Sequence, residues 1–206
     1  MTGPASLHIA LLAAGSSSRM RGRDKLLEEV DGMPLLRLAA TRARATGCSV
    51  IVTLPEADRP HAAARGAALD GLDVQRIAVA DAASGMSASF RALAAHVTGP
   101  LLVMLADMPE IDGACLARLI EAHAGMPDRV VRATASDGTP GQPVVFPARL
   151  VPAMADLAGD AGARALLRQE DVHGVALPGN AALTDLDTPE AWAAWRGARP
   201  GGTLSR

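Results

Sequence analysis

The stretch Leu12-Ala13-Ala14-Gly15-Ser16-Ser17-Ser18-Arg19-Met20, which continues to Lys25, carries most of the information in this chain. It follows an apolar run, 9–13, of the kind that forms a buried strand. Alanine, glycine and serine have little side-chain bulk, so backbone N–H groups here can close around an anion. Arg19 and Lys25 add two positive charges at the mouth of the loop. This pattern suits a nucleotide triphosphate, although an ordinary solvent-exposed turn also favours small polar residues.

Two commoner phosphate-binding loops are excluded by the spacing. The dinucleotide fingerprint needs three glycines as G-x-G-x-x-G, whereas Gly15 stands alone until Gly22. The Walker loop needs Gly-Lys-Ser/Thr, whereas Lys25 lies between Asp24 and Leu26. The loop therefore belongs to neither class.

Strands and helices alternate along the first two thirds of the chain. Apolar, often β-branched runs predict strands at 9–13, 49–54, 74–79 and 101–105. Helical spacing predicts helices between Pro34 and Gly47, over 59–69, and from Ser87, as the N-cap, to His96. This alternation predicts an α/β fold with three layers, α/β/α, around a mostly parallel sheet. Farther on, 130–135 and 143–146 flank Asp137-Gly138 and predict a hairpin, in which the second segment could be an ordinary edge strand.

Three aspartates are candidates for holding a metal ion. Asp107 follows the buried strand 101–105, at the end where open α/β sheets bind ligands. Asp112 is better placed to cap the next helix, which leaves Asp107 without a structural role. Asp185 and Asp187 point to one face if their segment is extended, and Thr188-Pro189 forms a good helix start. Mg²⁺ is the expected ion, with Asp185 slightly preferred over Asp187 because Asp187 could still cap that helix.

Composition bounds the class of protein. The 206 residues fit a single domain, 1–196, with a disordered tail over 197–206. The net charge of −2, with charges interspersed, argues against a nucleic-acid partner or an anionic membrane. We expect a cytoplasmic protein without membrane spans, because no apolar run is long enough and residues 1–7 lack the features of a leader peptide. Cys48 and Cys115 show no metal spacing and are expected to be buried thiols.

Six ordered segments between Leu12 and Glu190 together resemble the MobA-like nucleotidyltransferases, and most closely the molybdopterin cytidylyltransferases. They are Ala13 to Met20 with Lys25-Leu26-Leu27, Gly85-Met86-Ser87, Asp107-Met108-Pro109, Gly141 to Phe146, Gly159 to Arg164, and Asp185 to Glu190. Two departures are visible. Arg21 precedes Gly22 and lengthens the span from Arg19 to Lys25 by one residue, and Gln142 replaces the family's usual histidine.

The resemblance implies a Rossmann-like fold of the nucleotide-diphospho-sugar transferase type. It implies Mg²⁺-dependent transfer of CMP from CTP to the terminal phosphate of molybdopterin, with release of pyrophosphate. A molybdoenzyme or its chaperone could be a further partner. Arg19, Lys25 and Asp107 are then the catalytic residues, and Asp107, Asp185 and Asp187 hold the metal. The nucleotide-binding residues would be Leu12, Ala13, Ala14, Gly15, Ser16, Ser17, Arg19, Lys25, Leu54, Pro55, Asp81, Gly85, Met86 and Ser87. The acceptor would be bound by Gly141, Gln142, Pro143 and Arg164.

The residue at position 14 favours cytosine as the base of the nucleotide substrate. The Ala13-Ala14-Gly15 form resembles the cytidylyl branch, and the methyl group of Ala14 would narrow the space where base or ribose meets the loop. The alternatives are a cytidylyltransferase for a sugar-alcohol phosphate of isoprenoid synthesis, a guanylyltransferase for molybdenum cofactor, and a non-catalytic nucleotide-binding regulator or molybdoenzyme chaperone. For Asp160 a helix-capping role accounts for the residue without any ligand.

Overall fold

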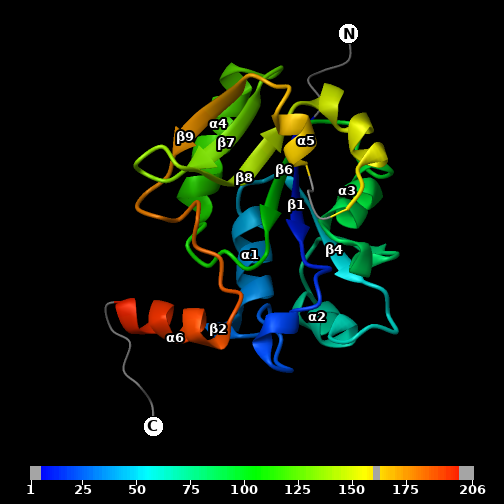
Figure 1. Ribbon diagram of the computed structural model, residues 1–206, viewed down its shortest axis with the longest axis vertical. Coiled ribbons are helices and arrows are strands. Elements are labelled where there is room, and N and C mark those ends of the chain that lie inside the picture. Colours follow the sequence, from blue (N-terminus) through cyan, green and yellow to red (C-terminus); the bar gives the residue numbers. More distant parts are fainter. Residues whose placement is uncertain (1–5, 160–162, 200–206) are drawn as a thin grey trace.

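A seven-stranded sheet forms the middle layer of the computed structural model, which describes residues 6–159 and 163–199 (Figure 1). Its strands are β1 (His8–Leu12), β4 (Ser49–Pro55), β5 (Gln75–Val79), β6 (Leu101–Leu105), β7 (Val130–Thr134), β8 (Pro140–Phe146) and β9 (Val172–Ala176). They lie in the order β5-β4-β1-β6-β8-β7-β9. Within it β8 alone runs antiparallel to its neighbours β6 and β7. A separate two-stranded ribbon pairs β2 (Glu29–Val30) with β3 (Met33–Pro34).

Helices cover both faces of the sheet. On one face, α1 (Leu35–Arg44) and α4 (Gly113–Gly125) share a core with the strands. On the other, α3 (Met86–Ala94) packs with short 3₁₀ turns at 148–150 and 152–156 and with α5 (Arg164–Leu167). The remaining helices are α2 (Ala62–Ala68) and α6 (Pro189–Ala198), and further 3₁₀ turns lie at 18–20 and 82–84. The predicted three-layer α/β fold with a mostly parallel sheet is confirmed.

The two cores explain why the strands read as continuous apolar runs. In β1, Ile9 and Leu11 point into the core with α1 and α4, whereas Ala10 points into the core with α3. Because both faces of the sheet are covered, the successive side chains of Ile9, Ala10 and Leu11 are all buried, and alternation with polar residues is lost. The apolar run 9–13 was therefore a correct signal for a central strand.

Two predicted helix caps are confirmed and one is wrong. The Asp112 carboxylate accepts from the Cys115 N–H at 2.8 Å, and the Thr188 hydroxyl accepts from the Ala191 N–H at 3.1 Å. The N-cap of α3 is Gly85 rather than Ser87, and its φ of 104° with ψ of −175° is a conformation that glycine adopts readily. Ser87 instead lies buried in the first turn, where its hydroxyl donates to the Gly159 carbonyl.

Other element boundaries shift by a few residues. Helix α2 begins at Ala62 rather than at 59, after His61 adopts a left-handed φ of 67°. Pro34 belongs to β3 and occupies the N-cap position of α1, so it precedes the first helical turn. The predicted hairpin is present as the antiparallel pair β7 and β8, but β8 lies between β6 and β7 and is not an edge strand.

The C-terminal segment is ordered beyond the predicted boundary at residue 196. Helix α6 continues through Ala198, and Arg199 forms an ion pair with Asp31 at 2.8 Å. Residues 200–206, like Asp160, lie outside the described residues. Cys115 is buried as expected, whereas Cys48 is partly exposed. No helix in the described part of the chain is long and apolar enough to cross a bilayer.

Candidate active site

The candidate site lies where the parallel strands β1, β4 and β6 end. The Ala13 N–H donates to the Thr53 carbonyl at 3.0 Å, and the Ala106 N–H donates to the Leu12 carbonyl at 3.3 Å. These bonds extend the sheet pairing by one residue past β1 and set the loop 13–20 beside the segment that begins at Ala106. The sheet therefore brings the small-residue loop and Asp107 together at one edge, where open α/β sheets bind ligands.

The loop 13–20 has an open face at Gly15. A methyl group at Gly15 would meet no other atom within 4 Å, and Gly15 is not among the residues with positive φ. Neither strain nor packing therefore explains a glycine here. Farther along, Ser17 adopts a left-handed φ of 54°, and Met20 is fully buried in a cluster with Leu186 and Trp192 that anchors the end of the loop.

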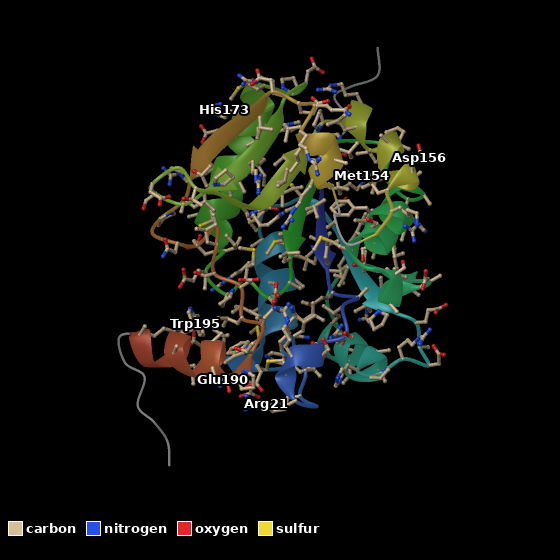
Figure 2. All side chains as sticks on the ribbon, viewed as in Figure 1. Arg21, Met154, Asp156, His173, Glu190 and Trp195 are labelled. Carbon is tan, nitrogen blue, oxygen red and sulfur yellow. The ribbon has the colours of Figure 1, made fainter. Side chains whose placement is uncertain are left out.

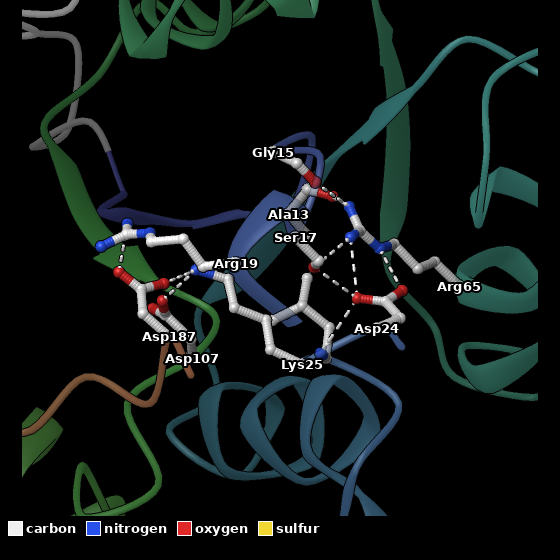
Figure 3. A network of polar contacts seen from close by, with 10 residues as sticks. Ala13, Gly15, Ser17, Arg19, Asp24, Lys25, Arg65, Asp107 and Asp187 are labelled. Carbon is white, nitrogen blue, oxygen red and sulfur yellow. Dashed lines mark hydrogen bonds and ion pairs between the residues drawn. The ribbon is translucent and has the colours of Figure 1, made fainter. Parts of the chain in front are cut away.

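A buried arginine holds the loop from behind, and no sequence motif pointed to it (Figure 3). Arg65 of α2 is fully buried, and its guanidinium pairs with both carboxylate oxygens of Asp24 at 2.7 and 2.8 Å. The same guanidinium donates to the carbonyls of Ala13 and Gly15, at 2.6 and 2.7 Å, and to the Ser17 hydroxyl. Arg65 thus satisfies two loop carbonyls and fixes the loop to α2.

Asp24 is the buried counter-charge of this network. Burial alone would raise its pKa, but hydrogen bonds and charge from Arg65, and further hydrogen bonds from Ser17 and Leu26, outweigh burial and lower the pKa. The carboxylate therefore stays ionised. Because the Ser17 hydroxyl donates to Asp24, its side chain belongs to this scaffold, and only its backbone remains available to a nucleotide.

The three predicted metal ligands converge. Asp107, Asp185 and Asp187 each offer a carboxylate oxygen, and these oxygens lie within 4.8 Å of one another. The Lys25 ammonium contacts both Asp107 and Asp187, and the Arg19 guanidinium contacts Asp187 at 2.5 Å (Figure 3). The carboxylates of Asp185 and Asp187 lie close together, as expected if both point to one face. Thr188 caps α6, so Asp187 does not serve as its cap.

The geometry of these carboxylates fits a divalent cation. Oxygens on opposite sides of a Mg²⁺ ion lie about 4.2 Å apart, since each Mg²⁺–O distance is about 2.1 Å. Asp107 Oδ1 is buried and has no hydrogen-bond partner among the described residues, so one ligand oxygen remains available besides the one that Lys25 contacts. Burial, followed by the negative charges of Asp107 and Asp187, raises the pKa of Asp185, and a bound cation would offset this repulsion.

Lys25 reaches these carboxylates despite the extra residue at position 21. Burial would lower its pKa, but the charges and hydrogen bonds of Asp107 and Asp187 raise it, so the ammonium is retained. Arg21 adopts a left-handed φ of 53° and forms an ion pair with Glu190 at 2.6 Å, as Figure 2 shows at the edge of the molecule. Lys25 is the only lysine in the sequence.

A cavity of about 340 Å³ adjoins the carboxylates. Among its lining residues are Asp185, Met86 and three of the predicted acceptor residues, Gly141, Gln142 and Arg164; Pro143 is not among them. Gly141 has a packing reason to be glycine, because a methyl group there would lie 2.1 Å from the Ala182 carbonyl oxygen. Gln142 Oε1 is buried, and no residue in the described part of the chain forms a hydrogen bond with it.

The other predicted nucleotide-binding residues frame the loop from the neighbouring strands. Leu54 and Pro55 end β4 and are buried, and Asp81 has a left-handed φ of 56° before the turn at 82–84. Ala14 is buried against Val79 and Ala88. Its methyl group is therefore part of the packing under the loop, and any influence on the base would act through the position of the loop.

Comparison with known proteins identifies the family of this chain. The MobA-like NTP transferase domain matches residues 9–174, which include the loop, Asp107 and the predicted acceptor residues. The chain therefore belongs to this family. It is a nucleotidyltransferase of the MobA-like type.

Relatives of this MobA-like domain include curated proteins and solved structures. The bifunctional protein GlmU of Clavibacter sepedonicus is 31% identical over 121 residues, 57% of this chain and 24% of that protein. The chain thus spans about a quarter of the length of the curated relatives it matches. The structure of Rv0371c from Mycobacterium tuberculosis is 26% identical with a TM-score of 0.79, covering 94% of this chain and 98% of that one, and Rv0371c has also been solved in complex with manganese. At 13% identity and a TM-score of 0.73, over 94% and 98% of the two chains, a CMP:2-keto-3-deoxy-manno-octonic acid synthetase shares the fold.

The MobA-like loop can be tested at Gly15. Gly15→Ala should leave stability within about 0.5 kcal/mol, because nothing lies near the added methyl group. It should raise the KM for the nucleotide at least about tenfold, since blocking one backbone N–H removes a charge-assisted hydrogen bond of about 1.5–3 kcal/mol. Gly66→Ala is the matched control, because Gly66 also has free space around it but lies in α2. An unchanged KM in Gly15→Ala would contradict phosphate binding by this loop.

Proposed function

We propose that the protein transfers CMP from CTP to the terminal phosphate of molybdopterin and releases pyrophosphate. The observation that carries the proposal is that Asp185 belongs both to the carboxylate cluster and to the lining of the 340 Å³ cavity. A nucleotide held by the loop 13–20 and an acceptor held in the cavity would therefore meet at the same carboxylates. Such a meeting point is what in-line transfer between two phosphates requires.

Positioning and charge neutralisation supply the chemistry, since nucleotidyl transfer needs no protein nucleophile. The backbone around Gly15 would hold the triphosphate, with Arg65 keeping the loop carbonyls turned toward α2. Lys25 and Arg19, which now neutralise Asp107 and Asp187, would shift toward the charge that builds up on the departing pyrophosphate. Asp107, Asp185 and Asp187 would hold Mg²⁺, which polarises the α-phosphate when bound. The manganese complex of Rv0371c supports a divalent ion in a related chain.

The choice of CTP and molybdopterin rests on the resemblance in the two recognition segments. Gly85-Met86-Ser87 begins α3, and Met86, which is exposed, lines the cavity next to the carboxylates. Gly141 and Gln142 line the same cavity. Gln142 offers an amide in place of a titratable histidine, so it can orient the acceptor by hydrogen bonding but is not suited to take its proton.

The decisive experiment is a substrate panel. The protein is incubated with each of the four NTPs, Mg²⁺ and molybdopterin, and pyrophosphate release is followed. Turnover with CTP alone supports the proposal. Equal turnover with GTP would overturn the cytidylyl assignment, but the protein would still be a nucleotidyltransferase. Turnover with a sugar-alcohol phosphate in place of molybdopterin would overturn the acceptor. No turnover with any NTP would favour a non-catalytic nucleotide-binding protein.

The kinetics of Lys25→Ala show whether Lys25 stabilises the transition state or only the bound nucleotide. If Lys25 neutralises charge on the leaving pyrophosphate, kcat should fall on the order of 100-fold, more than the KM for CTP rises. Lys25→Arg keeps the charge and should recover part of kcat. A change confined to KM would mean that Lys25 contributes only to nucleotide binding. Because Lys25 is the sole lysine, protection of its amine from an amine-selective reagent by CTP provides an independent check.

A further inference from the structure

Two arginines line the cavity, and neither forms an ion pair with a described residue. Arg132 on β7 and Arg164 at the start of α5 both line the 340 Å³ cavity that contains Asp185. The rest of its wall is largely apolar and includes Phe90, Met108 and Phe146. Within residues 6–159 and 163–199, no carboxylate lies within ion-pair distance of either guanidinium, although most other arginines there are paired.

Arg132 is held in place and lies close to Arg164. Its Nε donates to the Gly141 carbonyl at 2.8 Å, which fixes the plane of the guanidinium. Burial, and then the positive charge of Arg164, lowers the pKa of Arg132. Two like charges near one another, one of them partly buried, are unfavourable unless an anion lies between them. The guanidinium plane, with two terminal nitrogens left over, suits a bidentate contact to phosphate or carboxylate.

A third arginine, Arg168, lies in a second cavity that adjoins Arg132 and Arg164. A second cavity, of about 520 Å³, is also lined by Arg132 and Arg164 and adds Arg168 and Thr134. The arginines therefore stand between two cavities, in a chain whose net charge is −2. In the sheet order, β6 and β8 separate β7 from β1, so this positive cluster is distinct from Arg19 and Lys25 beside the loop.

We propose that Arg132 and Arg164, with Arg168 in the adjoining second cavity, form an oxyanion subsite for the acceptor substrate. The group bound there is a phosphate monoester or a carboxylate of the acceptor, whose apolar part lies against Phe90, Met108 and Phe146. That the anion belongs to the acceptor rests on the proposed function; that the cluster binds an oxyanion does not.

Calorimetric titration with inorganic phosphate tests the binding directly. Wild-type protein, Arg132→Gln and Arg164→Gln are compared with the control Arg76→Gln. Arg76 lies on the edge strand β5, and its guanidinium pairs with Asp70. A phosphate-binding event should weaken at least about tenfold in the two cavity variants, the loss of one charge-assisted contact, and stay unchanged in the control. Equal phosphate binding by all four proteins overturns the subsite. Repeating the titration with acetate distinguishes a carboxylate site from a phosphate site.

Arg132→Gln and Arg164→Gln are expected to differ in their effect on stability. Arg164 is exposed on α5, so Arg164→Gln should keep the wild-type melting temperature. If Arg132→Gln unfolds, Arg132→Lys keeps the charge and Arg164→Gln decides the question.

Kinetics separate this inference from the proposed function. With CTP and molybdopterin, Arg132→Gln should raise the acceptor KM at least about tenfold and leave the KM for CTP unchanged. Cytidylyl transfer with an unchanged acceptor KM would overturn the subsite and keep the function. Phosphate binding that depends on Arg132 in a protein without transferase activity would support the subsite and overturn the function.

Discussion

Asp107→Asn is expected to lower kcat at least ~100-fold, on the scale of losing an essential electrostatic contact in an active site. The carboxylate is nearly fully buried, with Oδ2 on Lys25 and Oδ1 without a partner. The amide keeps the size of the side chain but removes the charge that would hold Mg²⁺ and that Lys25 now neutralises. The measurement is kcat for pyrophosphate release over a range of Mg²⁺ concentrations.

Two further measurements make the Asp107 result specific. Mn²⁺ affinity, followed through the paramagnetic signal of the free ion, should fall at least about tenfold in Asp107→Asn. Asp112→Asn is the matched control, because Asp112 caps α4 five residues farther on and asparagine is an equally good N-cap. Near-normal kcat for Asp107→Asn at limiting Mg²⁺ would remove Asp107 from the site.

Arg65→Met is expected to destabilise the fold by about 3–5 kcal/mol at neutral pH, because it leaves the buried Asp24 carboxylate without its partner. The Ala13 and Gly15 carbonyls would lose their donor as well. Denaturant unfolding measures the loss. Arg76→Met, which breaks an exposed pair, should cost less than about 1 kcal/mol. Should Arg65→Met fail to fold, Arg65→Lys gives an intermediate loss.

The stability lost in Arg65→Met should depend on pH, and the pKa of Asp24 gives the direction of that dependence. In the wild type the pKa of Asp24 is below its ordinary value of 3.8, so its contribution is present above that pH and is lost as pH falls through the folded-state pKa. In Arg65→Met, burial without a partner raises the pKa of Asp24, so the variant gains stability as pH falls toward protonation. The difference between the two proteins should therefore shrink on acidification.

A double variant identifies the cause. Asp24→Asn combined with Arg65→Met removes the unpaired charge and should recover part of the stability that Arg65→Met loses. If the difference between wild type and Arg65→Met did not change with pH and the double variant recovered nothing, the cost would come from lost packing rather than from the charge on Asp24.

The sequence by itself determined the local parts of this protein. The run 9–13, the caps Asp112 and Thr188, and the small-residue loop depend on residues that are neighbours along the chain. Periodicity and capping act over a few residues, so their pattern is readable before the chain folds. Asp107 could be singled out for the same reason, because it directly follows a run that only a buried central strand explains.

Only the tertiary structure decided which distant side chains meet. The partner of Arg65 is Asp24, 41 residues away, and a lone arginine in an alanine-rich helix gives no sign of which carbonyls it will reach. Lys25 meets Asp107 and Asp187 across 82 and 162 residues, and Arg132 meets Arg164 because β7 and α5 pack at the same cavity. Ser87 looked like a cap, but its hydroxyl was taken by a carbonyl 72 residues away. A buried polar group must find a partner among whatever the packing brings near, and that choice depends on the arrangement of whole layers.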